Sequence, residues 1–299
     1  MHFDSDLLRN FLELCRHGSF SRAAEKLHKS QSGLSTQIAM LEDQAGTRFF
    51  DRSQRPLRLT ETGLIFFHFA TEILNKADEL NRQLKEHTKG VAGEVRIAAI
   101  PSVGAFLLPE IIAEILKTSP KINLIISVQP ASLVYEAVRQ SKVDFAVVLT
   151  DRPPEHLVVR RLRRERLCFV ASKNHALAQN PNLTIAQLRS TPFVVGPAGG
   201  GYTGMINRLV EKKRAFTLPI AVRIAGFEGI KESVRAGLGL GILPAFMVKR
   251  ELSNNDLVEF FVNGIRLSAD LILIERPRYA PTPTAASVKA LIEKQIVGG

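Results

Sequence analysis

Apolar residues recur at helical spacing in the first part of the chain and predict three short helices. The first predicted helix has five apolar residues on one face, Leu7, Leu8, Phe11, Leu12 and Cys15. His17-Gly18 ends this helix, Ser19 can cap a second short helix, and Ser30 can cap a third. The third helix has an apolar inner face of four residues, Leu34, Ile38, Leu41 and Ala45.

The outer face of the third predicted helix lacks the Lys and Glu residues of an ordinary solvated helix. It carries short hydrogen-bonding side chains instead: Gln31, Ser32, Ser35 and Thr36. Short side chains let a helix backbone approach a partner closely, and the free N–H groups of a first helical turn favour a phosphate. Two short helices before such a third one indicate a helix-turn-helix. The alternative is a three-helix bundle with a serine-rich surface.

Arginines follow the third helix in a short segment. Gly46 ends the helix, and four arginines then come within eleven residues, opposed only by Asp51: Arg48, Arg52, Arg55 and Arg58. Evenly spaced arginines on a short hairpin repel one another, and a phosphate backbone offsets that repulsion. This segment therefore predicts a wing that contacts DNA, and it favours the helix-turn-helix over the plain bundle.

A long helix is predicted next, capped by Thr60 and running to about His87. Six apolar residues recur along it at spacings of four and three: Phe66, Ala70, Ile73, Ala77, Leu80 and Leu84. This spacing is a heptad seam, which can pair two copies of the chain. Phe67 and Phe69 widen the apolar surface beyond a narrow seam, so packing of the helix on its own domain is the alternative.

Beyond residue 90, short apolar strands alternate with helices, which predicts an α/β fold with mainly parallel strands. Strands are expected near residues 94–100, 122–128, 143–149, 166–171, 192–196, 219–224, 239–243 and 269–275. Ligands of such sheets collect beyond the carboxyl ends of the strands. Four places fit this rule, namely residues 101–103, residues 129–132, Thr150 and residues 199–203.

The chain has 299 residues and a formal net charge of +11. Residues 1–90 hold 13 basic and 12 acidic side chains, so the other 27 basic and 17 acidic side chains leave +10 in the second part. Five arginines crowd one stretch of that part: Arg160, Arg161, Arg163, Arg164 and Arg166. This stretch is a solvated surface, an oligomer contact or a second DNA-facing patch, and we favour the first. The DNA prediction thus rests on spacing, while the charge weakly supports an anionic ligand.

Several other classes of protein are disfavoured by the sequence. The longest apolar run, residues 237–248, is too short to span a bilayer, and the polar N-terminus lacks a secretory signal. Cys15 and Cys168 lie far apart, which is typical of the reducing cytoplasm and disfavours a disulfide switch, although oxidation of a single thiol stays open. The seven histidines show no metal-binding spacing. We expect a cytoplasmic protein with no metal, no cofactor and no membrane partner.

Residues 18–63 read GSFSRAAEKLHKSQSGLSTQIAMLEDQAGTRFFDRSQRPLRLTETG and resemble the winged helix-turn-helix of LysR-type transcriptional regulators. The matching motif residues are Gly18 to Phe20, Ala23, Ala24, Ser30, Gln31, Leu34, Ser35, Gln37, Ile38, Leu41, Glu42, Phe49 to Arg52, and Leu59 to Gly63. Ser32, Gly33 and Thr36 depart from the Pro, Ala and Arg that the family commonly has, which makes transfer of a family half-site unsafe. We expect DNA contacts from Ser30, Gln31, Ser32, Ser35, Thr36, Gln37, Arg52, Arg55 and Arg58.

The segments VDFAVVL, ERLCFVASKNHALA and VRAGLGLGILP resemble the effector domain of the same family. The resemblance implies a periplasmic-binding-protein-like fold with two α/β subdomains around a cleft. It divides the chain into a winged helix-turn-helix (1–60), a linker and dimerisation helix (61–90) and an effector-binding domain (91–299), with subdomain I at about 91–163 and 266–299 and subdomain II at about 164–265. The expected effector-binding residues are Ser102, Val103, Gln129, Ser132, Thr150, Gly201, Thr203 and Phe227. The alternative for each hydroxyl is a local capping or turn role.

Two other functions compete with regulation. The G-x-G-x-x-G pattern at Gly199–Gly204, with Glu228 beyond it, is typical of an NAD(P)-dependent oxidoreductase, but Pro197 precedes it and no catalytic partner stands out. A dimeric ligand-binding scaffold would differ only in lacking DNA binding. We interpret the chain as a transcriptional regulator without enzymatic activity, which binds a pseudo-palindromic site on double-stranded DNA as a homodimer and is controlled by a small-molecule effector. The resemblance further implies a homotetramer.

Overall fold

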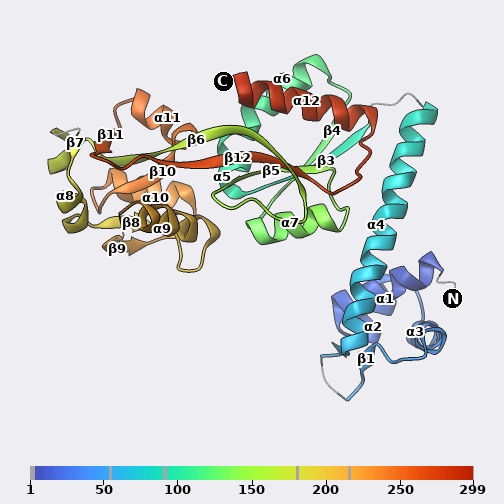
Figure 1. Cartoon of the computed structure of the whole chain (residues 1–299). Coiled ribbons are helices and arrows are strands. Elements are labelled where there is room, and N and C mark those ends of the chain that lie inside the picture. The colour runs from blue at the N-terminus through green and yellow to red at the C-terminus, as the bar shows by residue number, and fades with distance from the viewer. Residues whose placement is uncertain (1–3, 54–55, 90–92, 180–181, 215–216, 299) are drawn as a thin grey trace. The chain divides into compact units, whose positions relative to one another are not determined.

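The computed structural model describes residues 4–53, 56–89, 93–179, 182–214 and 217–298 (Figure 1). The chain forms two compact units, residues 1–90 with 140–142, and residues 91–139 with 143–299. In the first unit the elements are α1 (Ser5–His17), α2 (Phe20–Lys26), α3 (Gln31–Ala45), β1 (Phe50–Asp51), β2 (Arg58–Leu59) and α4 (Glu61–Lys89).

The helix boundaries follow from local backbone chemistry. Gly18 ends α1 in the left-handed region at φ +60°, where a glycine has no steric cost. Ser30 caps α3 as expected, because its hydroxyl accepts a hydrogen bond from the N–H of Gly33 at 3.0 Å. Thr60 caps α4 in the same way through the N–H of Gly63. Ser19 occupies the N-cap position of α2 as expected, but its side chain makes no capping hydrogen bond.

Phenylalanine rings form the centre of the first unit. The ring of Phe11 is fully buried and packs against Phe49, Phe50 and Phe66, with ring centroids 5.5, 5.3 and 4.9 Å away. Phe66 also stacks on Phe49 at 4.2 Å. The start of α4 therefore belongs to the same core as α1 and the hairpin, and burial of these rings is the main source of stability here.

The heptad seam predicted on α4 has the wrong register in its first half. Phe66 and Ala70 pack into the core of the first unit, so they are not available to a second chain. The apolar side chains that remain exposed on α4 are Leu64, Ile65, Phe69, Ile73, Leu80 and Leu84. The expected seam and the exposed stripe coincide only from Ile73 onward.

The second unit is built on one large sheet and a small one. The large sheet has the order β4-β3-β5-β12-β6-β11-β7, with β10 also paired to β6, and the small sheet pairs β8 with β9. The strands are β3 (Glu94–Ala99), β4 (Asn123–Val128), β5 (Phe145–Thr150), β6 (Val158–Ser172), β7 (Asn182–Leu183), β8 (Phe193–Val195), β9 (Ile220–Arg223), β10 (Gly241–Pro244), β11 (Leu257–Val262) and β12 (Leu267–Glu275). The helices are α5 (Pro101–Phe106), α6 (Leu108–Thr118), α7 (Ala131–Arg139), a 3-10 turn (Ala176–Gln179), α8 (Ile185–Ser190), α9 (Gly201–Arg214), α10 (Phe227–Arg235), α11 (Ala245–Ser253) and α12 (Pro283–Gly298).

The expectation of mainly parallel strands was wrong, because the sheet is mixed. β3 is parallel to β4 and β5, whereas β12 is antiparallel to β5 and β6, and β6 is antiparallel to β10 and β11. Two long strands cause this difference. Figure 1 shows β6 and β12 running side by side along the second unit, where β12 also pairs with β5, and β6 also pairs with β10 and β11. β6 also begins at Val158, eight residues before the predicted strand.

The arginine-rich stretch lies in this first part of β6. Four of its arginines form ion pairs with acidic residues: Arg160 with Glu293, Arg161 with Asp270, Arg163 with Glu165, and Arg166 with Glu259. Arg160, Arg161 and Arg166 are exposed, and ion pairs of exposed arginines contribute little to stability, whereas Glu165, the partner of Arg163, is buried.

Gly63 provides a test of how the wing meets α4. A Cβ at this position would lie 2.1 Å from the carbonyl oxygen of Phe49, which belongs to the segment leading into β1. We expect Gly63→Ala to destabilise the first unit by about 1–3 kcal/mol, because backbone has to move to accommodate the methyl group. Denaturant unfolding followed by circular dichroism measures the change. Gly298→Ala, which would meet open space, is the matched control, and equal stability of the two variants would contradict this packing.

Candidate functional site

The exposed side of α3 carries most of the polar residues singled out in the sequence. Gln31, Ser32 and Thr36 are exposed, and Ser35 is half-buried. The hydroxyl of Thr36 donates to the carbonyl oxygen of Ser32 at 3.0 Å, and Gln31 accepts a hydrogen bond from Ser21 on α2. These local bonds hold the polar side chains close to the helix, which leaves a shallow hydrogen-bonding surface without long charged groups.

Gln37 has a different environment from its neighbours on α3. Its Oε1 accepts hydrogen bonds from Nδ2 of Asn10 at 2.9 Å and from Nζ of Lys29 at 3.1 Å. Lys29 also donates to Oδ1 of Asn10 at 3.2 Å, and Asn10 is buried. The structure therefore places Gln37 in a network that fixes α3 against α1, where it positions the helix rather than reaching away from it.

Glu42 connects α3 to the wing. Glu42 is 6% exposed, and its Oε1 accepts hydrogen bonds from the backbone N–H groups of Phe49 at 2.7 Å and Phe50 at 3.2 Å. Oε2 pairs with the guanidinium group of Arg52 at 3.2 Å. A buried carboxylate is stable only when its oxygens are satisfied, and here three donors from the wing satisfy them. The wing is consequently fixed to the far end of the recognition helix.

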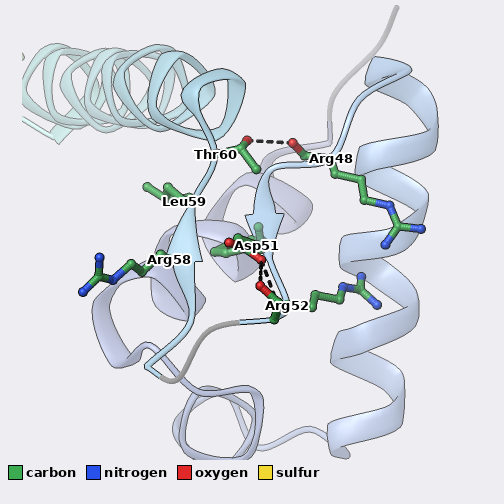
Figure 2. A pocket seen from close by; sticks show the side chains of 8 residues that line it. Arg48, Asp51, Arg52, Arg58, Leu59 and Thr60 are labelled. Atoms are coloured by element: carbon green, nitrogen blue, oxygen red, sulfur yellow. Dashed lines mark hydrogen bonds between the residues drawn. The ribbon is translucent and has the colours of Figure 1, made fainter.

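The arginines of the wing are exposed in two directions. Figure 2 shows the side chains of Arg48 and Arg52 on one side of the β1–β2 hairpin and that of Arg58 on the other. Arg52 differs from the other two because Glu42 holds part of its guanidinium group, and its ring contact with Phe20 at 5.8 Å adds a second constraint. The predicted contact residue Arg55 lies outside the described residues.

The second unit contains a cavity of about 500 Å³. It lies between the carboxyl ends of β3 and β5 on one side and the loop from β8 to α9, together with α10, on the other. The lining is largely apolar: Ile100, Pro101, Pro130, Ala131, Tyr135, Leu149, Pro197, Tyr202, Met205, Phe227 and Ile230. The polar lining residues are Ser102, Thr150, Asp151, Arg152, Thr203 and Arg208. This position and volume are typical of a small-molecule site.

Five of the eight residues expected to bind an effector line this cavity: Ser102, Thr150, Gly201, Thr203 and Phe227. The other three do not. Val103 belongs to α5 and is fully buried in the core, Ser132 is exposed on α7, and Gln129 donates a hydrogen bond to the backbone carbonyl of Leu133. Each of these three is a neighbour in sequence of a lining residue, and for Val103 on α5 and Ser132 on α7 the turn of a short helix directs the side chain elsewhere.

Hydroxyl groups in the cavity differ in whether they have partners. The hydroxyl of Thr150 donates to the carbonyl oxygen of Arg152 and accepts from its N–H, so it shapes the loop after β5. The hydroxyl of Tyr202 donates to the carbonyl oxygen of Ile242 at 2.8 Å. The hydroxyl of Ser102 is buried and has no partner among the described residues. A buried unpaired hydroxyl is costly, which makes Ser102 a candidate to bind a ligand.

Asp151 and Arg208 form an ion pair across the cavity that the sequence did not predict. Nε and Nη2 of Arg208 lie 2.9 and 2.6 Å from the two carboxylate oxygens of Asp151. Burial opposes ionisation of Asp151, but the hydrogen bonds and the positive charge of Arg208 outweigh it and lower the pKa of this carboxyl group. The same hydrogen bonds raise the pKa of Arg208. Asp151 directly follows the predicted strand end at Thr150, which is the signal that could have identified it.

The structure places the glycine-rich pattern differently from a dinucleotide site. Gly199 has a φ of +77° in the loop before α9, and Gly201 begins that helix. Glu228 lies in the first turn of α10 and pairs with Lys231 at 2.8 Å, instead of standing at the end of β9. Within the described ranges there is no group of three or more His, Cys, Asp or Glu residues suited to a metal ion. None of the helices in these ranges is long and apolar enough to cross a membrane.

Removal of the Glu42 carboxylate should destabilise the first unit, because it removes the hydrogen bonds and the ion pair that join α3 to the wing. We expect Glu42→Ala to lower the free energy of unfolding by about 2–4 kcal/mol, because two buried N–H groups lose their acceptor. Urea unfolding of the full chain measures this. Asp43→Ala is the control, since Asp43 is the exposed neighbour on the same helix. Two variants of equal stability would show that the carboxylate is dispensable.

The two thiols are expected to be inert in the folded chain. Burial raises the pKa of both Cys15 and Cys168 from 9.0 to about 12, which lowers the thiolate fraction at neutral pH by about a thousandfold. Ellman's reagent should therefore label neither thiol before the protein unfolds. Rapid labelling of one thiol per native chain would contradict this prediction and would support regulation by oxidation of a single thiol.

Comparisons with known proteins agree with the two units. The family model described as "Bacterial regulatory helix-turn-helix protein, lysR family" matches residues 5–64, and "LysR substrate binding domain" matches residues 88–296. The chain is similar to the RuBisCO operon transcriptional regulator of Allochromatium vinosum, with 30% identity over 98% of this chain and 96% of that protein. It is 26% identical to the HTH-type transcriptional regulator CysL of Bacillus subtilis over 91% of each chain.

Solved structures have the same fold. ArgP from Mycobacterium tuberculosis superposes with a TM-score of 0.73 at 22% identity, covering 99% of this chain and 98% of that one. CbnR, a LysR family transcriptional regulator, superposes with a TM-score of 0.72 at 18% identity, covering 98% and 99%. With a helix-turn-helix in the first unit and a ligand-sized cavity in the second, the chain belongs to the LysR family of bacterial transcriptional regulators.

Proposed function

We propose that α3 and the wing contact DNA together, as one rigid surface. The observation that supports this most strongly is the Glu42 carboxylate, which holds the wing backbone and Arg52 against the recognition helix. Ser32, Ser35 and Thr36 would face base edges, because they are short and lie along the exposed side of α3. Ser30 and Gln31 would lie near a phosphate at the start of the helix.

The wing arginines would supply most of the sequence-independent affinity. Arg48 and Arg58 are exposed on opposite sides of the hairpin and suit phosphate contacts, while Arg55 stays a predicted contact on the basis of the sequence alone. Arg52 would combine a phosphate contact with its ion pair to Glu42. Gln37 would act as a positioning residue, contrary to the expectation that it contacts DNA.

The domain roles follow the same proposal. Residues 1–60 would bind DNA, residues 61–90 would pair two chains, and residues 91–299 would bind the effector, with subdomain I at about 91–163 and 266–299 and subdomain II at about 164–265. Two chains would pair through the exposed apolar residues of α4 from Ile65 to Leu84, because contact with a second chain removes these side chains from water. Two recognition helices would then meet a pseudo-palindromic site, and a dimer of dimers would extend the contact.

The cavity of the second unit would bind a small effector and control the arrangement of the dimers on DNA. Binding can shift this arrangement only by the difference in affinity for its two forms. We propose no catalytic role: the Asp151 carboxylate is held by Arg208, and Thr150 and Tyr202 are bonded to backbone. An NAD(P)-dependent oxidoreductase and a scaffold that does not bind DNA are less well supported. The proposed location is the cytoplasm.

The exposed wing arginines give the sharpest test of DNA binding. We expect Arg48→Ala with Arg58→Ala to weaken binding to all DNA sequences and to reduce the slope of log affinity against log salt by about 2, or about one unit for each lost phosphate contact. Fluorescence anisotropy titrations at several salt concentrations measure both quantities.

The control for this test is Arg250→Ala, which removes an exposed arginine from α11 in the second unit. It should leave affinity and salt slope unchanged. An unaltered slope in the wing variant would argue for the scaffold, and a loss confined to one DNA sequence would assign the arginines to base reading.

A further inference from the structure

The charges that line the cavity do not cancel. Asp151 and Arg208 neutralise each other through two short hydrogen bonds, which leaves Arg152 as the remaining charged lining residue. Arg152 is exposed near the start of the loop after β5, and it forms no ion pair within the described part of the chain. The lining therefore carries a net charge of one positive unit, from two arginines and one aspartate.

The other lining residues indicate the polarity of the ligand that the cavity accepts. Three aromatic side chains, Tyr135, Tyr202 and Phe227, stand among aliphatic ones, and Tyr202 meets Phe227 edge to face at 5.1 Å. Such walls exclude strongly hydrated groups and favour an apolar or aromatic body. The unpaired hydroxyl of Ser102 offers a single buried hydrogen bond in addition.

We infer that the cavity selects a ligand with an apolar body and one negative charge, such as an aromatic or branched-chain monocarboxylate, and that Asp151 sets this charge. Asp151 stands where a second acidic group of a ligand would otherwise bind Arg208. It occupies both hydrogen-bonding sites of the guanidinium edge and so excludes dianions by repulsion and by competition. This inference rests on the proposed function of the second unit as an effector site.

Two substitutions change the lining charge in opposite directions. Asp151→Asn raises it from one to two positive units and leaves Arg208 open to a ligand. Arg208→Gln lowers it to zero and leaves Asp151 without its partner. Asp270→Asn is the matched control, because Asp270 also pairs with an arginine, Arg161 at 3.1 Å, but does not line the cavity.

Three probes with one phenyl body separate the charge states: phenylacetamide is neutral, phenylacetate is a monoanion and phenylmalonate is a dianion. Isothermal titration of the full chain should give phenylacetate about a tenfold lower Kd than either other probe. In Asp151→Asn, phenylmalonate should become the tightest of the three. In Arg208→Gln, phenylacetate should lose about tenfold in affinity, and Asp270→Asn should match the natural chain.

The inference is overturned if phenylacetate does not bind the natural chain, if phenylmalonate or phenylacetamide binds it as tightly, or if Asp151→Asn leaves the order of the probes unchanged. The same preparations are also titrated with DNA, which tests the proposed regulator function separately from the charge selection in the cavity. Ligand selection without DNA binding would contradict the proposed regulator and support the charge rule, whereas DNA binding without this selection would contradict the charge rule alone.

Discussion

The buried carboxylate of Glu42 is the interaction on which the DNA-facing geometry depends. A hairpin of two-residue strands with several arginines is not stable by itself, because its positive charges repel one another and few backbone hydrogen bonds pair its strands. Glu42 replaces that missing stability with hydrogen bonds to two consecutive backbone N–H groups and an ion pair to Arg52. The wing and α3 therefore form one surface, and the phenylalanine core beneath them holds it on α1 and α4.

A different constraint organises the second unit. β6 pairs with β12, β10 and β11, and β12 pairs with β5, so these two long strands connect the strands on which the cavity-lining loops stand. The ion pair of Asp151 with Arg208 and the edge-to-face contact of Tyr202 with Phe227 lie at that cavity. Under the proposed function, a ligand in this cavity controls DNA binding only if it binds one arrangement of the dimers more tightly than another.

Local signals in the sequence predicted much of this structure. The caps at Ser30 and Thr60, the order of the helices and the loop at Thr150 follow from hydrogen-bonding and strand-end rules that need only neighbouring residues. Non-local packing was not predictable in the same way. Both the buried and the exposed side of α4 carry apolar residues at spacings of three and four. Only the contacts with Phe11 and Phe49 show which side packs into the core.

Partners distant in sequence explain the other differences. Gln37 and Arg52 were predicted as DNA contacts from their positions in the sequence, which do not indicate that Asn10, Lys29 and Glu42 bond to their side chains. The antiparallel strand β12 returns from the end of the chain to pair with β5, a crossing that strand spacing does not encode. The arginine cluster in β6 was interpreted as a solvated surface, and most of its side chains are exposed, but its ion pairs with acidic residues on other strands and on α12 were not predictable from spacing.

The central claim is that a ligand in the cavity alters how paired recognition helices lie on DNA. DNase footprinting of the full chain on a DNA fragment selected from a random library, with and without a ligand whose binding has been measured, tests it most directly. The account predicts protection at two half-sites about 10 base pairs apart, with hypersensitive positions that move when the ligand is added. Identical footprints with and without a bound ligand, or no protection at all, would contradict it.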